Sequence, residues 1–104
     1  MNNFKSEVFY RAYRLTLTGI NFSQALTKSW AIYRLQKNMR SSVVEFRYKK
    51  IDGSLRQAFG TLIASVIDPL IKGTEKKHNP TLVTYFDNQK QEFRSFREEN
   101  LIIA

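Results

Sequence analysis

The chain has 104 residues, enough for one compact domain, and 42% of them are hydrophobic and 25% charged, as in ordinary folded proteins. The absence of cysteine excludes disulfides and thiolate metal sites, and no apolar run approaches the roughly 18 residues that a membrane span needs. The net charge of +8 favours encounters with polyanions such as nucleic acid.

The positive charge is unevenly distributed along the chain. Residues 1–40 carry seven Lys or Arg and one acidic residue, whereas residues 41–104 carry ten basic and eight acidic residues. Most of the excess therefore lies in the N-terminal part. That part also lacks the apolar core of a signal peptide, so we expect a cytoplasmic protein without a membrane partner.

The first predicted element is a helix over residues 2–19, ended by Gly19. One apolar face is indicated by residues spaced four and three apart, namely Phe4, Val8, Ala12 and Leu15. Glu7 is within reach of Arg11 and Arg14 one and two turns later. A second apolar stripe lies on another side and consists of Tyr10, Tyr13 and Leu17. A helix with two apolar sides is expected to pack between two elements or against a partner.

A second helix is predicted over residues 21–39, with Ser23 as its N-cap. Its predicted buried face consists of Leu26, Trp30, Tyr33 and the stem of Lys37, with the small residues Ala25 and Ser29 beside it. The short link between the two helices predicts a helical hairpin.

From Val43 the apolar period changes to two, which indicates strands. Asp52-Gly53 is a strong signal for a tight turn between two strands. A two-residue turn would place Lys49 opposite Arg56, and a longer, bulged turn would shift that register.

The remainder of the chain predicts an irregular segment followed by a second pair of strands. Residues 65–80 are expected to form a long loop with a short apolar strand at 67–71, before strands at 81–87 and 91–97 and a last one at 100–104. We therefore predict a single α+β domain over residues 1–104, in which a helical hairpin (1–40) precedes a small antiparallel barrel of four to five strands (41–104).

Two stretches of the second half resemble the WYL-like family of short SH3-like (Sm-like) barrels. These stretches are RYKKIDGSLRQAFGTL and VTYFDNQKQEFRSFREENLI, and the similarity extends over about residues 20–104. The resemblance implies an SH3-like barrel and an origin in bacteria or their phages. The family's Trp-Tyr-Leu triplet is absent, so the ligand-sensing role of larger members does not carry over. Barrels of this family end with an RSFR motif, which is matched here by Arg94, Ser95, Phe96 and Arg97. The resemblance implies that these residues are ligand contacts.

No catalytic signature is present in the sequence. The single histidine, His78, has no second His or Cys to share a metal with, and the four glycines are isolated rather than grouped in a phosphate-binding loop. Aspartate is favoured at turns and before proline because it forms local hydrogen bonds, and this explains the presence of Asp52, Asp68 and Asp87 without a catalytic role. We therefore expect a non-enzymatic protein with no metal and no cofactor.

Nucleic-acid binding is the leading functional prediction, because phosphates require Lys or Arg and bases stack on aromatic rings. The expected contacts are the basic residues of the two strand pairs, namely Arg47, Lys49, Lys50, Arg56, Arg94 and Arg97. Secondary basic contacts are expected from Lys37, Arg40, Lys76 and Lys77. Phe93 and Phe96 interleave with the last arginines, but their spacing of three predicts that at least one belongs to the core. The alternative is that these cations form an ordinary solvated strand face.

A protein–protein interaction module is the second functional prediction. The stripe of Tyr10, Tyr13 and Leu17 would then mediate self-association or, in a small phage protein, binding to a host protein. DNA and RNA are both compatible with the first prediction, and the sequence does not distinguish them.

Overall fold

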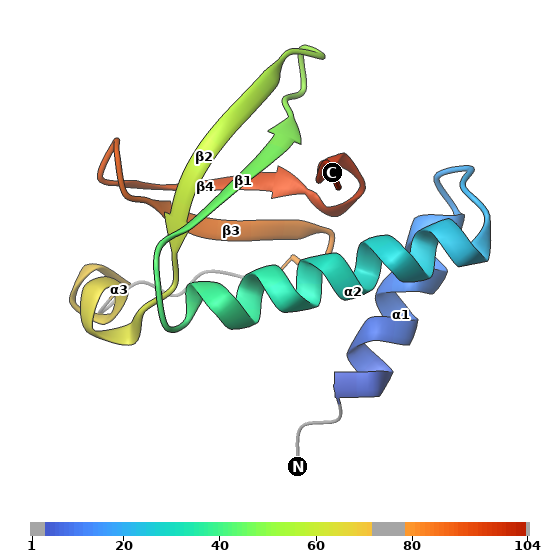
Figure 1. Cartoon of the computed structure of the whole chain (residues 1–104), viewed down its shortest axis with the longest axis horizontal. Coiled ribbons are helices and arrows are strands. Elements are labelled where there is room, and N and C mark those ends of the chain that lie inside the picture. Colours follow the sequence, from blue (N-terminus) through green and yellow to red (C-terminus); the bar gives the residue numbers. More distant parts are fainter. Residues whose placement is uncertain (1–3, 72–78, 104) are drawn as a thin grey trace.

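A computed structural model describes residues 4–71 and 79–103 and places two long helices against a four-stranded antiparallel sheet (Figure 1). The elements in chain order are α1 (Phe4–Thr16), α2 (Phe22–Met39), β1 (Val44–Lys49), β2 (Leu55–Thr61), α3 (Ala64–Ile71), β3 (Leu82–Asp87), β4 (Glu92–Arg97) and the short 3-10 helix η1 (Glu98–Asn100). The strands follow one another in the sheet in the order β1-β2-β3-β4. The predicted α+β order of helices before strands is confirmed.

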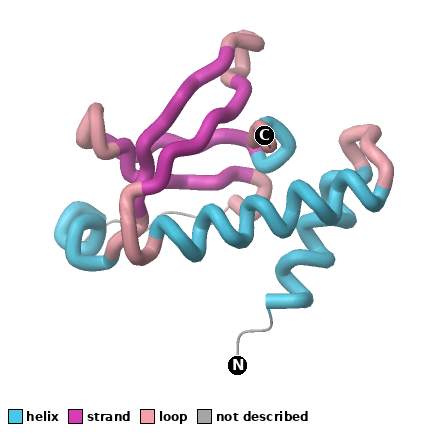
Figure 2. Tube along the Cα trace, viewed as in Figure 1, coloured by secondary structure: helices cyan, strands magenta, loops and turns pink. Residues whose placement is uncertain are grey.

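Helices α1 and α2 form the predicted helical hairpin, and α1 crosses α2 near the N-terminal end of α2 (Figure 2). Val8, Ala12 and Leu15 are at most 2% exposed, which confirms the predicted inner face of α1 at these three positions, while the side chain of Phe4 lies outside the described part. The Ser29 hydroxyl of α2 donates a hydrogen bond to the Val8 carbonyl at 2.7 Å, so the two helices approach closely at this point.

Two details of the α2 prediction were wrong. The N-cap is Asn21 rather than Ser23, because the Asn21 side chain accepts from the Gln24 amide at 2.8 Å and the Gln24 side chain returns to the Asn21 amide. The buried face is also rotated from the prediction, and it consists of Ala25, Ser29, Ile32, Leu35 and Met39. The rotation arises because α2 is covered twice: its small residues face α1, while Ile32, Leu35 and Met39 join the core against the sheet.

The β1–β2 turn contains three residues rather than two. The Gly53 amide bonds to the Lys50 carbonyl, the Lys50 amide bonds to the Ser54 carbonyl, and Gly53 has φ +90°, which favours glycine. Lys49 is consequently opposite Leu55, and Arg56 is opposite Tyr48. The two-residue register with Lys49 opposite Arg56 was therefore wrong. Because directly opposed residues share a sheet face, Arg56 lies on the same face as Tyr48.

The segment after β2 corrects another prediction. Residues 64–71 form helix α3 instead of a loop with an apolar strand, although Pro69 lies inside the helix. Pro69 lies near the helix C-terminus and removes only the bond to the Ser65 carbonyl, and Ser65 is exposed, so water can satisfy that carbonyl. The predicted loop residues 72–78, including Lys76, Lys77 and His78, lie outside the described residues.

The sheet is strongly bent but does not close as a barrel within the described residues. β2 and β3 pair only through Gly60 with Asp87 and Thr61 with Phe86. The predicted last strand is reduced to one bridge, in which Leu101 pairs with Tyr48 at the other edge of β1.

The main core lies between α2 and the concave face of the sheet. It consists of Ile32, Leu35, Met39, Phe46, Tyr48, Ala58, Val83, Tyr85, Phe96 and Leu101. Gly60 permits this packing, because a Cβ at that position would lie 2.7 Å from Cδ2 of Tyr85 and 2.9 Å from Cε1 of Phe46. Among the described residues, no helix is long and apolar enough to cross a membrane.

Candidate nucleic-acid interface

A cleft of about 1170 Å³ opens between the β1–β2 turn, β4, η1 and the C-terminal end of α1. Six basic side chains line it: Arg14, Lys49, Lys50, Arg56, Arg94 and Arg97. We call it the cationic cleft. It brings together all the predicted strand cations except Arg47, although these come from both strand pairs.

The remaining predicted cations lie elsewhere. Arg47 is exposed and opposite Gln57, on the sheet face that does not carry Tyr48 and Arg56. The Gln57 side chain bonds there to the carboxylate of Glu45, which gives Arg47 an acidic neighbour on its own strand. Lys37 and Arg40 are exposed at the C-terminal end of α2 and do not line the cleft.

Lys50 and Arg56 are the recessed cations of the cleft. Both side chains are half-buried, and neither forms a hydrogen bond or an ion pair with a described residue. The three-residue turn places Arg56 beside Tyr48 on the concave face, and it places Lys50 at the start of the turn. A half-buried guanidinium without a partner provides charge-assisted donors for an anion.

Arg94 lies in the same cleft but is already engaged. It is opposite Tyr85, and its Nε lies 3.3 Å from Oδ2 of the buried Asp87. Its terminal nitrogen bonds to Glu92 at 2.6 Å. Arg97 is more open, with only a 3.9 Å contact to Glu99. The two arginines of the RSFR motif therefore differ, because Arg94 pairs with two carboxylates and Arg97 is exposed.

The floor of the cleft is part of the aromatic core. The hydroxyls of Tyr48 and Tyr85 are hydrogen-bonded at 2.8 Å, and the ring of Phe96 stacks on Tyr48 with centroids 4.5 Å apart. Burial raises the pKa of Tyr85 well above its usual range, and the hydrogen bond between the hydroxyls of Tyr85 and Tyr48 raises it further. Phe96 is therefore the core member of the predicted Phe93–Phe96 pair, and Phe93 packs instead against Phe86.

One acidic side chain at the mouth of the cleft is held by its own turn. The Asp52 carboxylate accepts hydrogen bonds from the Ser54 hydroxyl at 2.6 Å and the Ser54 amide at 2.9 Å. These bonds hold the pKa of Asp52 below its usual value, so the carboxylate remains ionised at neutral pH. Its charge offsets part of the positive charge of the cleft.

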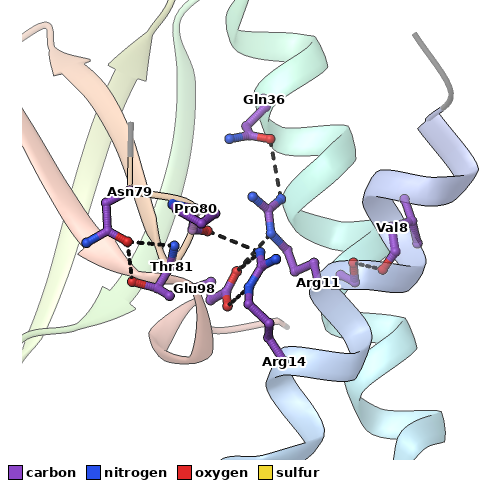
Figure 3. Close-up of polar contacts among 9 residues, drawn as sticks. Val8, Arg11, Arg14, Gln36, Asn79, Pro80, Thr81 and Glu98 are labelled. Carbon is purple, nitrogen blue, oxygen red and sulfur yellow. Dashed lines mark hydrogen bonds and ion pairs between the residues drawn. The ribbon is translucent and has the colours of Figure 1, made fainter. Parts of the chain in front are cut away.

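Arg11 and Arg14 converge on Glu98, which the sequence did not predict (Figure 3). The Arg11 Nε lies 3.0 Å from Oε1 of Glu98, and Arg14 bonds to both carboxylate oxygens at 3.0 and 3.1 Å. The predicted pairing of these arginines with Glu7 was therefore wrong, because Glu98 is 3% exposed and better placed, whereas Glu7 is exposed. We call this group of Arg11, Arg14 and Glu98 the Glu98 clamp. It joins α1 to the end of β4.

The predicted α1 stripe is exposed. Tyr10 is 70%, Tyr13 64% and Leu17 73% exposed, and Phe9 beside them is 50% exposed. Ser6, Phe9, Tyr10 and Tyr13 also line a shallow hollow of about 540 Å³. Leu17 in addition borders the cationic cleft. The stripe is an apolar surface that α2 leaves uncovered.

Comparison with known proteins identifies the family of the chain. Residues 32–102, more than half of the chain, match the family model described as WYL_2, Sm-like SH3 beta-barrel fold. The match begins inside α2 and includes the whole sheet, but it excludes α1. No curated protein and no solved structure matches the chain. The chain belongs to the WYL_2 family of Sm-like SH3 beta-barrel proteins.

Proposed function

We propose that the chain is a non-enzymatic nucleic-acid-binding accessory or regulatory protein of bacterial or phage origin, and that it binds through the cationic cleft. The observation that carries the proposal is the pair of recessed cations, Lys50 and Arg56, which have no ion-pair partner among the described residues. A phosphate bound there would not have to displace an internal carboxylate. The exposed Lys49 and Arg97 extend the basic surface along the mouth of the cleft.

The physical basis of binding is the replacement of condensed counterions by Lys and Arg. Each phosphate contact reduces the logarithm of the binding constant by about 0.9 per tenfold rise in salt for duplex DNA and about 0.7 for a single strand. A site built from Lys50, Arg56 and their exposed neighbours therefore predicts binding that weakens steeply with salt.

The test is fluorescence anisotropy with single- and double-stranded oligonucleotides at two salt concentrations. Lys50→Gln/Arg56→Gln should weaken binding at least tenfold and reduce the salt dependence by the equivalent of one to two phosphate contacts. The single variant Arg56→Gln should weaken binding about tenfold, and Arg47→Gln is its matched control, because it removes one exposed arginine from the opposite face of the same strand pair. Equal losses in Arg47→Gln and Arg56→Gln would show that only net charge matters and would remove the cleft from the proposal.

Self-association or docking on a host protein is the second candidate function, and the exposure of the α1 stripe favours it. An apolar interface of this kind would persist at high salt, unlike binding to phosphates. Sedimentation velocity in 0.5 M salt tests self-association, with Tyr10→Ser/Leu17→Ser as the variant that should abolish it. A single monomeric species at all concentrations would exclude self-association.

A further inference from the structure

The aromatic rings that line the cationic cleft are not accessible to bases. Tyr48 and Phe96 are each 4% exposed, and their rings stack on one another at an interplanar angle of 15°. The ring of Tyr48 also packs beside that of Phe46, and its hydroxyl is bonded to that of Tyr85. Opening this cluster for a base would expose the main core of the domain.

The exposed apolar residues around the cleft are aliphatic. Ile51 at the turn is 90% exposed and Leu17 at the end of α1 is 73% exposed, and neither has a ring on which a base can stack. The exposed aromatics of the described residues lie instead on α1 and at the start of α2, and they do not line the cleft. Recognition of single strands by stacking requires accessible rings in the groove that holds the backbone.

The polar groups of the cleft are suited to phosphate. Arg56 is half-buried on the concave face and has no partner among the described residues, so its fork of donors can take two phosphate oxygens. Lys50 lies at the beginning of the adjacent turn and adds a point charge. The ionised Asp52 of the same turn lies close enough to Lys50 to interact with its charge, so it offsets part of that charge and leaves Arg56 as the stronger anion contact.

We infer that the cationic cleft binds the phosphodiester backbone alone, with Arg56 as its recessed phosphate contact, and leaves the bases unstacked. This inference rests on the proposed function and specifies its ligand chemistry. DNA and RNA share that chemistry, so the cleft accepts either backbone.

The experiment compares three single-stranded probes of equal length by fluorescence anisotropy: oligo-dT, oligo-rU and an abasic deoxyribose-phosphate strand. The abasic strand should bind within about threefold of oligo-dT, since a stacked base would otherwise contribute about 5- to 150-fold. Oligo-rU should also bind within about threefold, and a larger preference for either sugar would overturn the claim that the shared phosphodiester suffices.

The variants locate the contact. Arg56→Gln should weaken binding to oligo-dT and to the abasic strand by the same factor, about tenfold, and lower the salt slope for both by about 0.7. Arg47→Gln should leave both affinities within twofold. A variant that affects oligo-dT but not the abasic strand would show that Arg56 contacts a base.

The two possible failures are distinguishable. If oligo-dT binds but the abasic strand is tenfold weaker or worse, bases are stacked and the inference fails while the proposed function stands. If neither the three probes nor the double-stranded oligonucleotide binds at low salt, the proposed function itself fails.

Discussion

The Glu98 clamp and the cationic cleft use the same residue type in opposite ways. In the clamp, Arg11 and Arg14 surround one buried carboxylate and join α1 to the end of β4. In the cleft, Lys50 and Arg56 are also half-buried, but neither forms an ion pair with a described carboxylate, and only Asp52 of the adjoining turn acts on the charge of Lys50. The difference is that the first group of cations is neutralised by the fold and the second is available to a ligand.

Charge counted along the sequence therefore differs from charge available on the surface. The helical part carries most of the net positive charge, yet two of its arginines are engaged by Glu98, which is 87 and 84 residues away from them. The nearly balanced part of the chain supplies the unpaired cations of the cleft. A segment with little net charge can thus hold the stronger anion site.

The largest expected effect comes from breaking the clamp. Glu98→Gln leaves two partly buried guanidinium groups without a counter-charge, and we expect a loss of about 2–4 kcal/mol in the free energy of unfolding, because Arg14 retains some solvent. Urea denaturation measures this loss. Glu99→Gln is the control, since this carboxylate is 31% exposed, lies at the long distance of 3.9 Å from Arg97 and otherwise interacts with Lys28; the substitution should cost less than about 1 kcal/mol. Equal losses of stability in Glu98→Gln and Glu99→Gln would show that the Glu98 clamp does not stabilise the fold.

The clamp also shows what the sequence can and cannot predict. The inner face of α1 and the strand pairs follow from local periodicity, and the structure agrees. Helix periodicity predicts a partner for Arg11 on the same helix, because a single sequence carries no signal for a contact with Glu98 near the other end of the chain. The rotation of α2 has the same origin, since it depends on how α1 and the sheet divide its surface.

The next effect concerns the floor of the cleft. Tyr85→Phe leaves the Tyr48 hydroxyl buried without its partner and should lower the free energy of unfolding by about 1–2 kcal/mol. Tyr48→Phe should do the same, and the double variant should lose less than the two single losses combined, because no unpaired hydroxyl remains. A double-mutant cycle by urea denaturation measures the coupling, and additive losses would contradict a direct bond.

A smaller effect is expected at high pH. Since the folded state raises the pKa of Tyr85 above its ordinary value of 10.0, the unfolded chain releases this proton first and stability is lost as pH rises through 10. Between pH 9 and 10.5 the contribution of this group is about 0.8 kcal/mol. Tyr85→Phe should remove it, so the native protein should lose more stability than the variant over this interval. An equal loss of stability in the native protein and the variant would show that the pKa of Tyr85 does not differ between the folded and unfolded states.

The register of the β1–β2 pair explains why the cleft could be only partly predicted. Alternation located the cations on the correct strands, but the face on which each points depends on the length of one turn. One additional turn residue moves Arg56 from a position opposite Lys49 to one opposite Tyr48, inside the cleft. The Asp-Gly signal marks the turn and does not distinguish the two lengths. The contribution of β4 to the cleft depends on the bend of the sheet, for which the sequence has no periodic signal.

The smallest expected effect separates the two groups of cations most clearly. Arg56→Gln removes a cation that pairs with no described residue, so the free energy of unfolding should change by less than about 0.5 kcal/mol, in contrast to the loss in Glu98→Gln. The same substitution is expected to weaken oligonucleotide binding about tenfold, so stability and binding respond to different arginines. Urea denaturation of Arg56→Gln beside Arg11→Gln tests this separation, because Arg11 belongs to the clamp and its loss should destabilise the fold. If Arg56→Gln is as destabilising as Arg11→Gln, Arg56 is a structural residue and the cleft loses its recessed anion contact.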